Sequence, residues 1–159
     1  MAVFPKILVP FDTSKNAFNA LDKAVAIAKE SPDIELEILY VAVIPKSSLQ
    51  GNYATYAYSA ESQFSDVNSI IQAATNELQN EYEDIKALIA DHIDGVDGRV
   101  KLTLIPGMSP VDDIVEYAEK IRCDLIVMGS RGLGAIRGIM GSVSTGVLRY
   151  ASMPVLIVK

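Results

Sequence analysis

The chain has 159 residues, a length typical of one domain that buries about 70% of the surface its unfolded form would expose. Half of the residues are hydrophobic, which suits a sheet buried on both faces, whereas the net charge of -6 argues against a general nucleic-acid binder. No run of about 18 apolar residues suggests a membrane span, the amino-terminal residues do not resemble a secretory leader, and Cys123 is the sole cysteine, so we expect one cytoplasmic domain over residues 1–159.

The first half of the chain is predicted to alternate strand and helix. Residues 6–11 read as a short buried strand that ends at Asp12-Thr13-Ser14, a group of helix-capping residue types. Apolar residues three and four apart then predict a helix that stops at Ser31-Pro32-Asp33. Residues 35–44 read as the second strand. Residues 45–60 carry three tyrosines without a clear period, and we predict a mobile surface loop there.

The same alternation continues in the second half. The predicted elements are a long amphipathic helix over about 62–90, a strand over 100–105, a turn over 106–110, a helix over about 111–121, a strand over 124–128, a helix that begins near Ser142, and a last strand over 155–158. Such alternation predicts an α/β fold with an open, doubly wound, mainly parallel five-stranded sheet flanked by helices. Ligands of such sheets bind at the carboxyl ends of the strands, where Asp12 and Gly129 lie.

A glycine-rich segment follows the fourth predicted strand. Glycines occur at positions 129, 132, 134, 138 and 141, and Ser142 and Ser144 follow at the start of a helix. Glycine lets backbone N–H groups approach an anion closely, and a helix N-terminus favours negative charge. Because Arg131, Arg137 and Arg149 lie in or just after this segment, the pattern predicts a binding site for an anionic, nucleotide-like ligand.

The glycine-rich segment does not match two common nucleotide signatures, so both classes are disfavoured. No lysine occurs between Lys120 and Lys159, so the segment is not a P-loop. The glycines also lack the Gly-x-Gly-x-x-Gly order of a dinucleotide-binding Rossmann protein. On spacing alone, a flexible connection between a strand and a helix remains an alternative.

Both ends of the chain resemble the universal stress protein family. The stretch from Asp124 to Gly134, the sequence Gly141-Ser142-Val143-Ser144 and residues 149–158 are similar to its carboxyl-terminal signature, and residues 7–14 resemble its first strand and turn. The likeness implies a Rossmann-like fold of the adenine nucleotide alpha hydrolase type. In ATP-binding members the loop reads Gly, two residues, Gly, nine residues, then Gly-Ser/Thr. Here eight residues separate Gly132 from Gly141, one fewer than in that pattern.

The resemblance implies a set of nucleotide-binding residues. Three at the end of the first strand would line the nucleoside pocket, Val41 would face adenine through its backbone beside Met128, and residues of the glycine-rich segment would hold ribose and phosphates. The set is Pro10, Phe11, Asp12, Val41, Met128, Gly129, Arg131, Gly132, Gly141, Ser142, Val143 and Ser144. Asp12 could touch the nucleoside or help to position Mg²⁺, and capping the first helix is the alternative for it. The metal ligands themselves are not predicted.

The resemblance thus implies an ATP-binding stress-response protein that acts as a nucleotide-dependent switch, with Mg²⁺ beside the phosphates. We expect at most slow or partner-stimulated hydrolysis, because no general base or activated nucleophile can be assembled from the segment. The apolar strand 155–158 is expected at a sheet edge, where a second copy would form a homodimer.

Two alternatives remain. One is a dimeric interaction module of the same fold that binds no nucleotide, and the shortened glycine segment favours it. The other is an adenylating or ATP-pyrophosphatase enzyme, which generally carries a Ser-Gly-Gly phosphate loop where this chain has Pro10 to Ser14. His92, the sole histidine, has no Cys or second His at ligand spacing and is predicted to be a solvated side chain.

Overall fold

A computed structural model of the chain describes residues 1–43, 64–134 and 139–159. The strands are β1 (Lys6–Pro10), β2 (Glu35–Val43), β3 (Val100–Gly107), β4 (Leu125–Gly129) and β5 (Val155–Val158). The helices are α1 (Lys15–Lys29), α4 (Phe64–Ile89), α5 (Pro110–Ile121) and α6 (Ser142–Tyr150), with a short 3-10 turn, η1 (Asp97–Arg99). The predicted order of elements is therefore confirmed.

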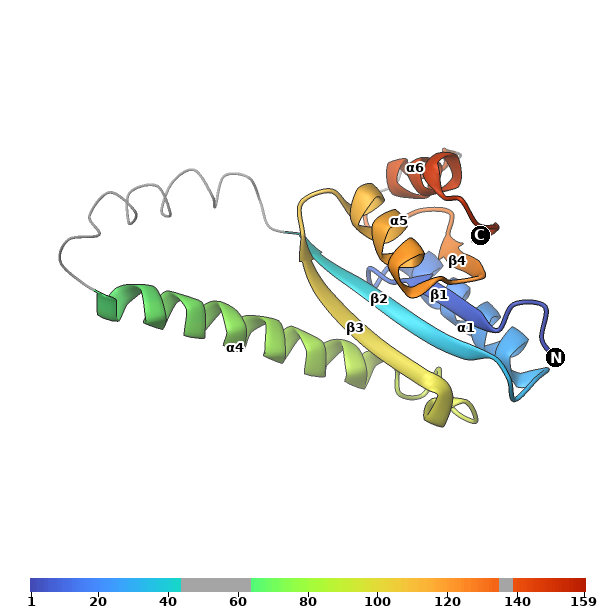
Figure 1. Cartoon of the computed structure of the whole chain (residues 1–159), viewed down its shortest axis with the longest axis horizontal. Coiled ribbons are helices and arrows are strands. Elements are labelled where there is room, and N and C mark those ends of the chain that lie inside the picture. The colour runs from blue at the N-terminus through green and yellow to red at the C-terminus, as the bar shows by residue number, and fades with distance from the viewer. Residues whose placement is uncertain (44–63, 135–138) are drawn as a thin grey trace.

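The five strands form one parallel sheet in the order β3-β2-β1-β4-β5 (Figure 1). The chain adds β2 and β3 on one side of β1 and then crosses back to add β4 and β5 on the other side. This order is that of an open doubly wound sheet, as predicted, and the reversal lies between β1 and β4. The last strand, β5, is an edge strand, also as predicted.

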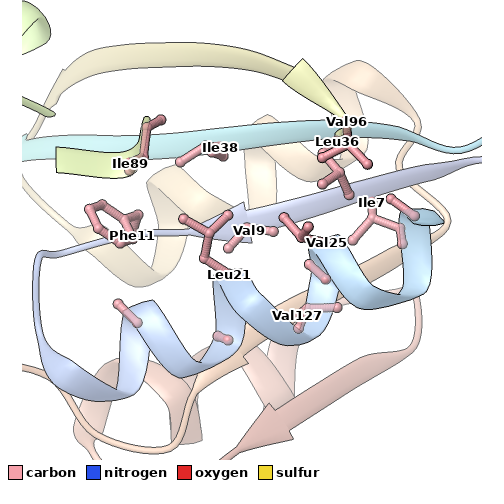
Figure 2. Packing of buried hydrophobic residues seen from close by; sticks show 14 of the residues in the cluster. Ile7, Val9, Phe11, Leu21, Val25, Leu36, Ile38, Ile89, Val96 and Val127 are labelled. Carbon is pink, nitrogen blue, oxygen red and sulfur yellow. The ribbon is translucent and has the colours of Figure 1, made fainter. Parts of the chain in front are cut away.

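Helices cover both faces of the sheet. Ile7 and Val9 of β1 point to one face, where they pack with α1 and the end of α4 (Figure 2). Leu8 between them belongs to a second cluster, with residues of α5 and α6 on the other face. All three side chains are fully buried. Strands buried on both faces are mostly apolar, which explains the long apolar runs in the sequence.

The turn predicted over residues 106–110 begins later than expected. Pro106 and Gly107 belong to β3, where they pair with Ala42 and Val43 of β2. Because β3 is an edge strand, the missing N–H of Pro106 removes no bond to a further strand, and proline is tolerated there. The prediction treated proline and glycine as breakers, and only the position of the strand in the sheet shows that they are not.

Helix α4 runs alongside β3 and extends beyond the rest of the sheet (Figure 1). Its carboxyl-terminal part joins the core through Ile85 and Ile89. The loop predicted over residues 45–60 lies outside the described residues. No helix in the described part of the chain is long and apolar enough to cross a membrane.

Candidate functional site

A cleft of about 390 Å³ opens where the strand order reverses. The carboxyl ends of β1, β2 and β4 form its floor, and the amino-terminal ends of α1, α5 and α6 surround it. Every residue that the sequence predicted for the nucleotide site lines this cleft, although the prediction came from segments far apart in the chain. They are Pro10, Phe11, Asp12, Val41, Met128, Gly129, Arg131, Gly132, Gly141, Ser142, Val143 and Ser144.

The sequence prediction missed other lining residues. They are Ser14, Ala17, Leu39, Val43, Pro110, Ile114, Leu133 and Gly134. Leu39 and Val43 lie two positions either side of Val41 on the same strand, so the period of two along β2 could have identified them. Ile114 gave no such signal, because it enters the cleft only through the packing of α5 on the sheet. These apolar side chains give the cleft a floor suited to a flat, poorly hydrated ring.

The backbone of Val41 is open to the cleft. The carbonyl of Leu39 accepts a hydrogen bond of 2.9 Å from the N–H of Phe11, so Leu39 turns its backbone groups toward β1. Backbone groups along a strand alternate in direction, so the N–H and C=O of Val41 point the same way. Pro10, opposite Leu39, is the last residue of β1. Val41 therefore offers one donor and one acceptor beyond the end of the neighbouring strand.

The opposite end of the cleft is the N-terminus of α6. Gly141 is the N-cap residue, and no side chain caps the first N–H groups of this helix. Those groups and the helix dipole favour an anion. The hydroxyl of Ser144 is 3.0 Å from the carbonyl oxygens of both Ser130 and Gly141, so its proton is already donated within the protein.

Two charged side chains occur among the described residues of the cleft, Asp12 and Arg131. Arg149, which the sequence analysis grouped with Arg131, lies in the last turn of α6. The helix has nine residues, so its two ends are roughly 13 Å apart, and Arg149 does not line the cleft. Arg137 lies outside the described residues. The expected group of three arginines is thus reduced to Arg131 in the described part of the site.

Asp12 does not cap α1, contrary to the alternative considered for it. The cap is Ser14, whose hydroxyl oxygen accepts a hydrogen bond of 3.2 Å from the N–H of Ala17. Asp12 accepts one of 3.0 Å from the N–H of Ser14 through Oδ1. Its Oδ2 lies against Gly132, where an added Cβ would collide with it. Asp12 therefore binds the backbone of Ser14, the N-cap residue of α1, through one oxygen, and its other oxygen faces the glycine-rich segment.

Hydrogen bonds close the base of the glycine-rich segment. We define this loop base as Gly129, Ser130, Arg131 and Gly141. The carbonyl of Ser130 accepts from the N–H of Gly141 at 2.8 Å, and the N–H of Ser130 donates to the carbonyl of Val158 at 2.7 Å. The Ser14 hydroxyl donates a hydrogen bond of 3.4 Å to the carbonyl of Arg131, so it also ties the loop base to α1. No role of Ser130 was predicted from the sequence.

Two further polar groups lie outside the cleft. Burial, the hydrogen bond to Glu81 and the negative charges of Glu81 and Asp12 raise the pKa of Tyr40 to about 12, so its phenol stays protonated at neutral pH. His92 was predicted to be a solvated side chain, but it also has partners in the protein. Its Nδ1 lies 2.6 Å from Asp22 Oδ1, and its ring packs on Phe18. In the described parts of the chain no three His, Cys, Asp or Glu side chains gather in a way that could hold a metal ion.

The sequence is similar to known proteins along nearly the whole chain. The sequence model of the Universal stress protein family matches residues 4–159. Universal stress protein YxiE of Bacillus subtilis is 35% identical, with 99% of this chain and all of that protein aligned. Universal stress protein MJ0577 of Methanocaldococcus jannaschii is 32% identical, over 99% of this chain and 96% of its own.

Solved structures share the fold. The structure of MJ0577 superposes with a TM-score of 0.70 at 29% identity, covering 99% of this chain and 97% of that one. A universal stress protein in complex with cAMP gives 0.59 at 24% identity, covering 99% and 98%. One from Archaeoglobus fulgidus in complex with dAMP gives 0.57 at 22% identity, covering 99% and 100%. The family model matches this chain from Phe4 to Lys159, and the structure of MJ0577 has the same fold. This chain therefore belongs to the universal stress protein family.

Proposed function

We propose that this protein binds ATP in the cleft between β1 and β4 and acts as a nucleotide-dependent switch in a stress response. The observation that carries the proposal is the pairing, within one cleft, of an apolar floor that ends at the open backbone of Val41 with the uncapped N-terminus of α6. The first suits a base and the second suits phosphates. Proteins of this fold have been solved in complex with cAMP and with dAMP, so the fold accommodates adenosine phosphates.

The backbone of Val41 favours adenine over guanine. The Watson–Crick edge of adenine has an N6 amino donor next to the N1 acceptor, which match the C=O and N–H of Val41. Guanine has an O6 acceptor and an N1–H donor in the same places. Its O6 would therefore face the C=O of Val41, and its N1–H would face the N–H of Val41, so neither hydrogen bond could form. A site whose buried polar groups are left unpaired rejects the wrong ligand strongly. We therefore expect ATP to bind much more tightly than GTP.

The phosphates would lie at the N-terminus of α6, near Arg131. The N–H groups of Ser142 and Val143 would donate to phosphate oxygens there. Mg²⁺ in nucleotide sites uses one or two carboxylates together with phosphate oxygens and water, and Asp12 is the carboxylate in the described part of the cleft. The ion would neutralise phosphate charge in addition to Arg131, the arginine in the described part of the cleft.

Binding, rather than turnover, is the proposed activity. Asp12 is the one carboxylate among the described lining residues, and it already accepts a hydrogen bond from the N–H of Ser14. His92 pairs with Asp22 outside the cleft. With no free general base among the described residues beside the phosphates, we expect intrinsic hydrolysis to be slow or absent. A homodimer through the edge strand β5 would transmit the bound state to a partner.

Thermal unfolding of nucleotide-free protein tests this proposal. ATP with Mg²⁺ at about 100 times its dissociation constant should stabilise the folded state by roughly 2.7 kcal/mol. GTP at the same concentration should give little shift. Gly132→Ala should weaken the response to ATP, because the added methyl group would displace the Asp12 carboxylate from its position in the cleft.

Gly134→Ala is the matched control. Gly134 belongs to the same segment and also lines the cleft, but an added Cβ there meets nothing within 4 Å. Its response to ATP should equal that of the wild type. If the wild type shows no shift with ATP, the proposal is wrong, and the nucleotide-free interaction module of the same fold becomes the better account.

A further inference from the structure

We propose that Asn16 is a positioning residue of the phosphate site, which fixes the loop base from outside the cleft. Asn16 belongs to the first turn of α1 and does not line the cleft. Its side-chain Nδ2 donates a hydrogen bond of 2.9 Å to the hydroxyl oxygen of Ser130. The inference rests on the proposed function, because it assigns Asn16 a role in holding phosphates that the protein is proposed to bind.

Ser130 is the centre of the loop base. Its carbonyl accepts from the N–H of Gly141 and from the hydroxyl of Ser144, and its N–H donates to Val158. Each of these bonds uses the backbone of Ser130, so any residue other than proline could form them at this position. The bond from Asn16 is different, since it needs the Ser130 hydroxyl and a donor on α1. It is the contact through which the side chain of residue 130 is oriented.

Asn16 also limits where the end of β4 can lie. A Cβ added at Gly129 would come within 2.7 Å of the carbonyl carbon and 2.8 Å of the carbonyl oxygen of Asn16. The backbone of Gly129 therefore rests directly on the first turn of α1. The first two turns of α1 are held in place by Ala17, Ala20 and Leu21, which are at most 3% exposed. Asn16 thus connects the loop base to a rigid helix.

A fixed loop base places the N–H groups of α6 before a ligand arrives. The bond from Ser130 O to Gly141 N joins the end of β4 to the N-cap of α6. Movement of Ser130 would therefore move the first turn of α6, where phosphates are proposed to bind. Preorganisation of this kind raises affinity by reducing the ordering that binding requires. The part of the cleft proposed to bind adenine, at Val41 on β2, lies on a different strand and does not depend on the position of the loop base.

Because only the phosphate end of the cleft depends on the loop base, a positioning role of Asn16 can be distinguished from a merely structural one. The variants are Asn16→Ala, Ser130→Ala and the double variant, and the probes are ATP with Mg²⁺ and adenosine, measured by calorimetry. Loss of one neutral hydrogen bond should weaken ATP binding about fivefold in each single variant. Adenosine, which lacks phosphates, should bind within about twofold of the wild type. The double variant should be no weaker than either single one, because both remove the same bond.

Asn19→Ala is the matched control. Asn19 lies on the same helix and its Nδ2 also donates a hydrogen bond, of 3.1 Å, but to the carbonyl of Lys159 and not to the loop base. This variant should bind both ligands as the wild type does. Equal weakening of ATP and adenosine by Asn16→Ala, additive effects in the double variant, or unchanged ATP binding would each overturn the inference.

Amide hydrogen exchange provides a readout that needs no nucleotide. Asn16→Ala should speed the exchange of the Gly141 N–H, which is bonded to Ser130, and Asn19→Ala should not. If the wild type binds neither ATP nor adenosine, the proposed function fails, and this exchange decides whether Asn16 positions the loop base. Unchanged protection of Gly141 in Asn16→Ala would refute the positioning role in either case.

Discussion

At the scale of single residues, Thr13 has the least favourable backbone near the cleft. It lies between Asp12 and the cap residue Ser14, and its φ of 65° is in the left-handed region. Such a conformation costs an ordinary L-residue roughly 1–2 kcal/mol, and it is rare for a β-branched side chain. The bend lets Asp12 accept the hydrogen bond from the N–H of Ser14 while its other oxygen faces Gly132. Strain at Thr13 therefore accompanies the geometry of the site.

Thr13→Gly should stabilise the protein. Glycine adopts a positive φ without the steric cost, although it loses more conformational freedom on folding. The balance predicts a gain of about 0.5–1 kcal/mol in the free energy of unfolding, measured by urea denaturation. Thr13→Ala, which keeps a Cβ in the left-handed conformation, should show no such gain. Equal stabilisation by both variants would mean that the backbone of Thr13 is not strained.

At the scale of elements, Glu37 connects β2, β3 and α5. Its side chain is buried and accepts hydrogen bonds from Lys101 Nζ at 2.8 Å, from Thr103 Oγ1 at 2.9 Å and from the hydroxyl of Tyr117. Burial alone would raise the pKa of this carboxyl, but the hydrogen bonds from Lys101, Tyr117 and Thr103 outweigh it, so the pKa of Glu37 lies below its ordinary value. The charged form is therefore the one that the fold stabilises.

This carboxylate should make stability depend on pH in acid. A lowered folded-state pKa contributes stability above the ordinary value of about 4.5, and that contribution is lost as pH falls through the folded-state pKa. At pH 7, Glu37→Gln should be less stable than the wild type by about 1–2 kcal/mol, since hydrogen bonds to a charged group are lost. Urea denaturation from pH 7 to pH 3 should show the difference shrinking below pH 4.5. If the difference in unfolding free energy between Glu37→Gln and the wild type were constant across this pH range, ionisation of Glu37 would not contribute to stability.

At the scale of the whole molecule, the described strands leave one edge of β5 unpaired. It pairs with β4 on one side only. Large apolar side chains are exposed on β5 and the preceding α6: Leu148 at 51%, Tyr150 at 62% and Leu156 at 38%. An apolar edge strand is prone to pair with another chain. These exposures support the homodimer that we propose.

Light scattering after size exclusion tests the dimer. The wild type should have about twice the chain mass of 17.2 kDa, as expected for paired edges. Leu156→Lys should shift it toward the monomer, because a charge on an edge strand opposes pairing. Val3→Lys, at a residue 84% exposed outside the sheet, should leave the mass unchanged. A monomeric wild type at micromolar concentration would rule out pairing through β5.

The sequence by itself determined the order of elements and part of the lining of the cleft. Alternating apolar runs and helical periods are local patterns, and they predicted β1, α1 and the parallel sheet. The glycines and serines after β4 were recognisable because each marks a local requirement for close backbone approach or for a helix start. Their role in binding a nucleotide remains a prediction.

The tertiary structure decided what depends on neighbours. Pro106 is part of a strand because β3 is at the edge of the sheet, and Ile114 lines the cleft because α5 packs over it. The link from Asn16 to Ser130 joins residues 114 positions apart in the chain, and no local pattern contains such a pair. Local propensity acts over a few residues, whereas the order of strands sets which distant side chains meet. The anchoring of the loop base could therefore be found only in the folded molecule.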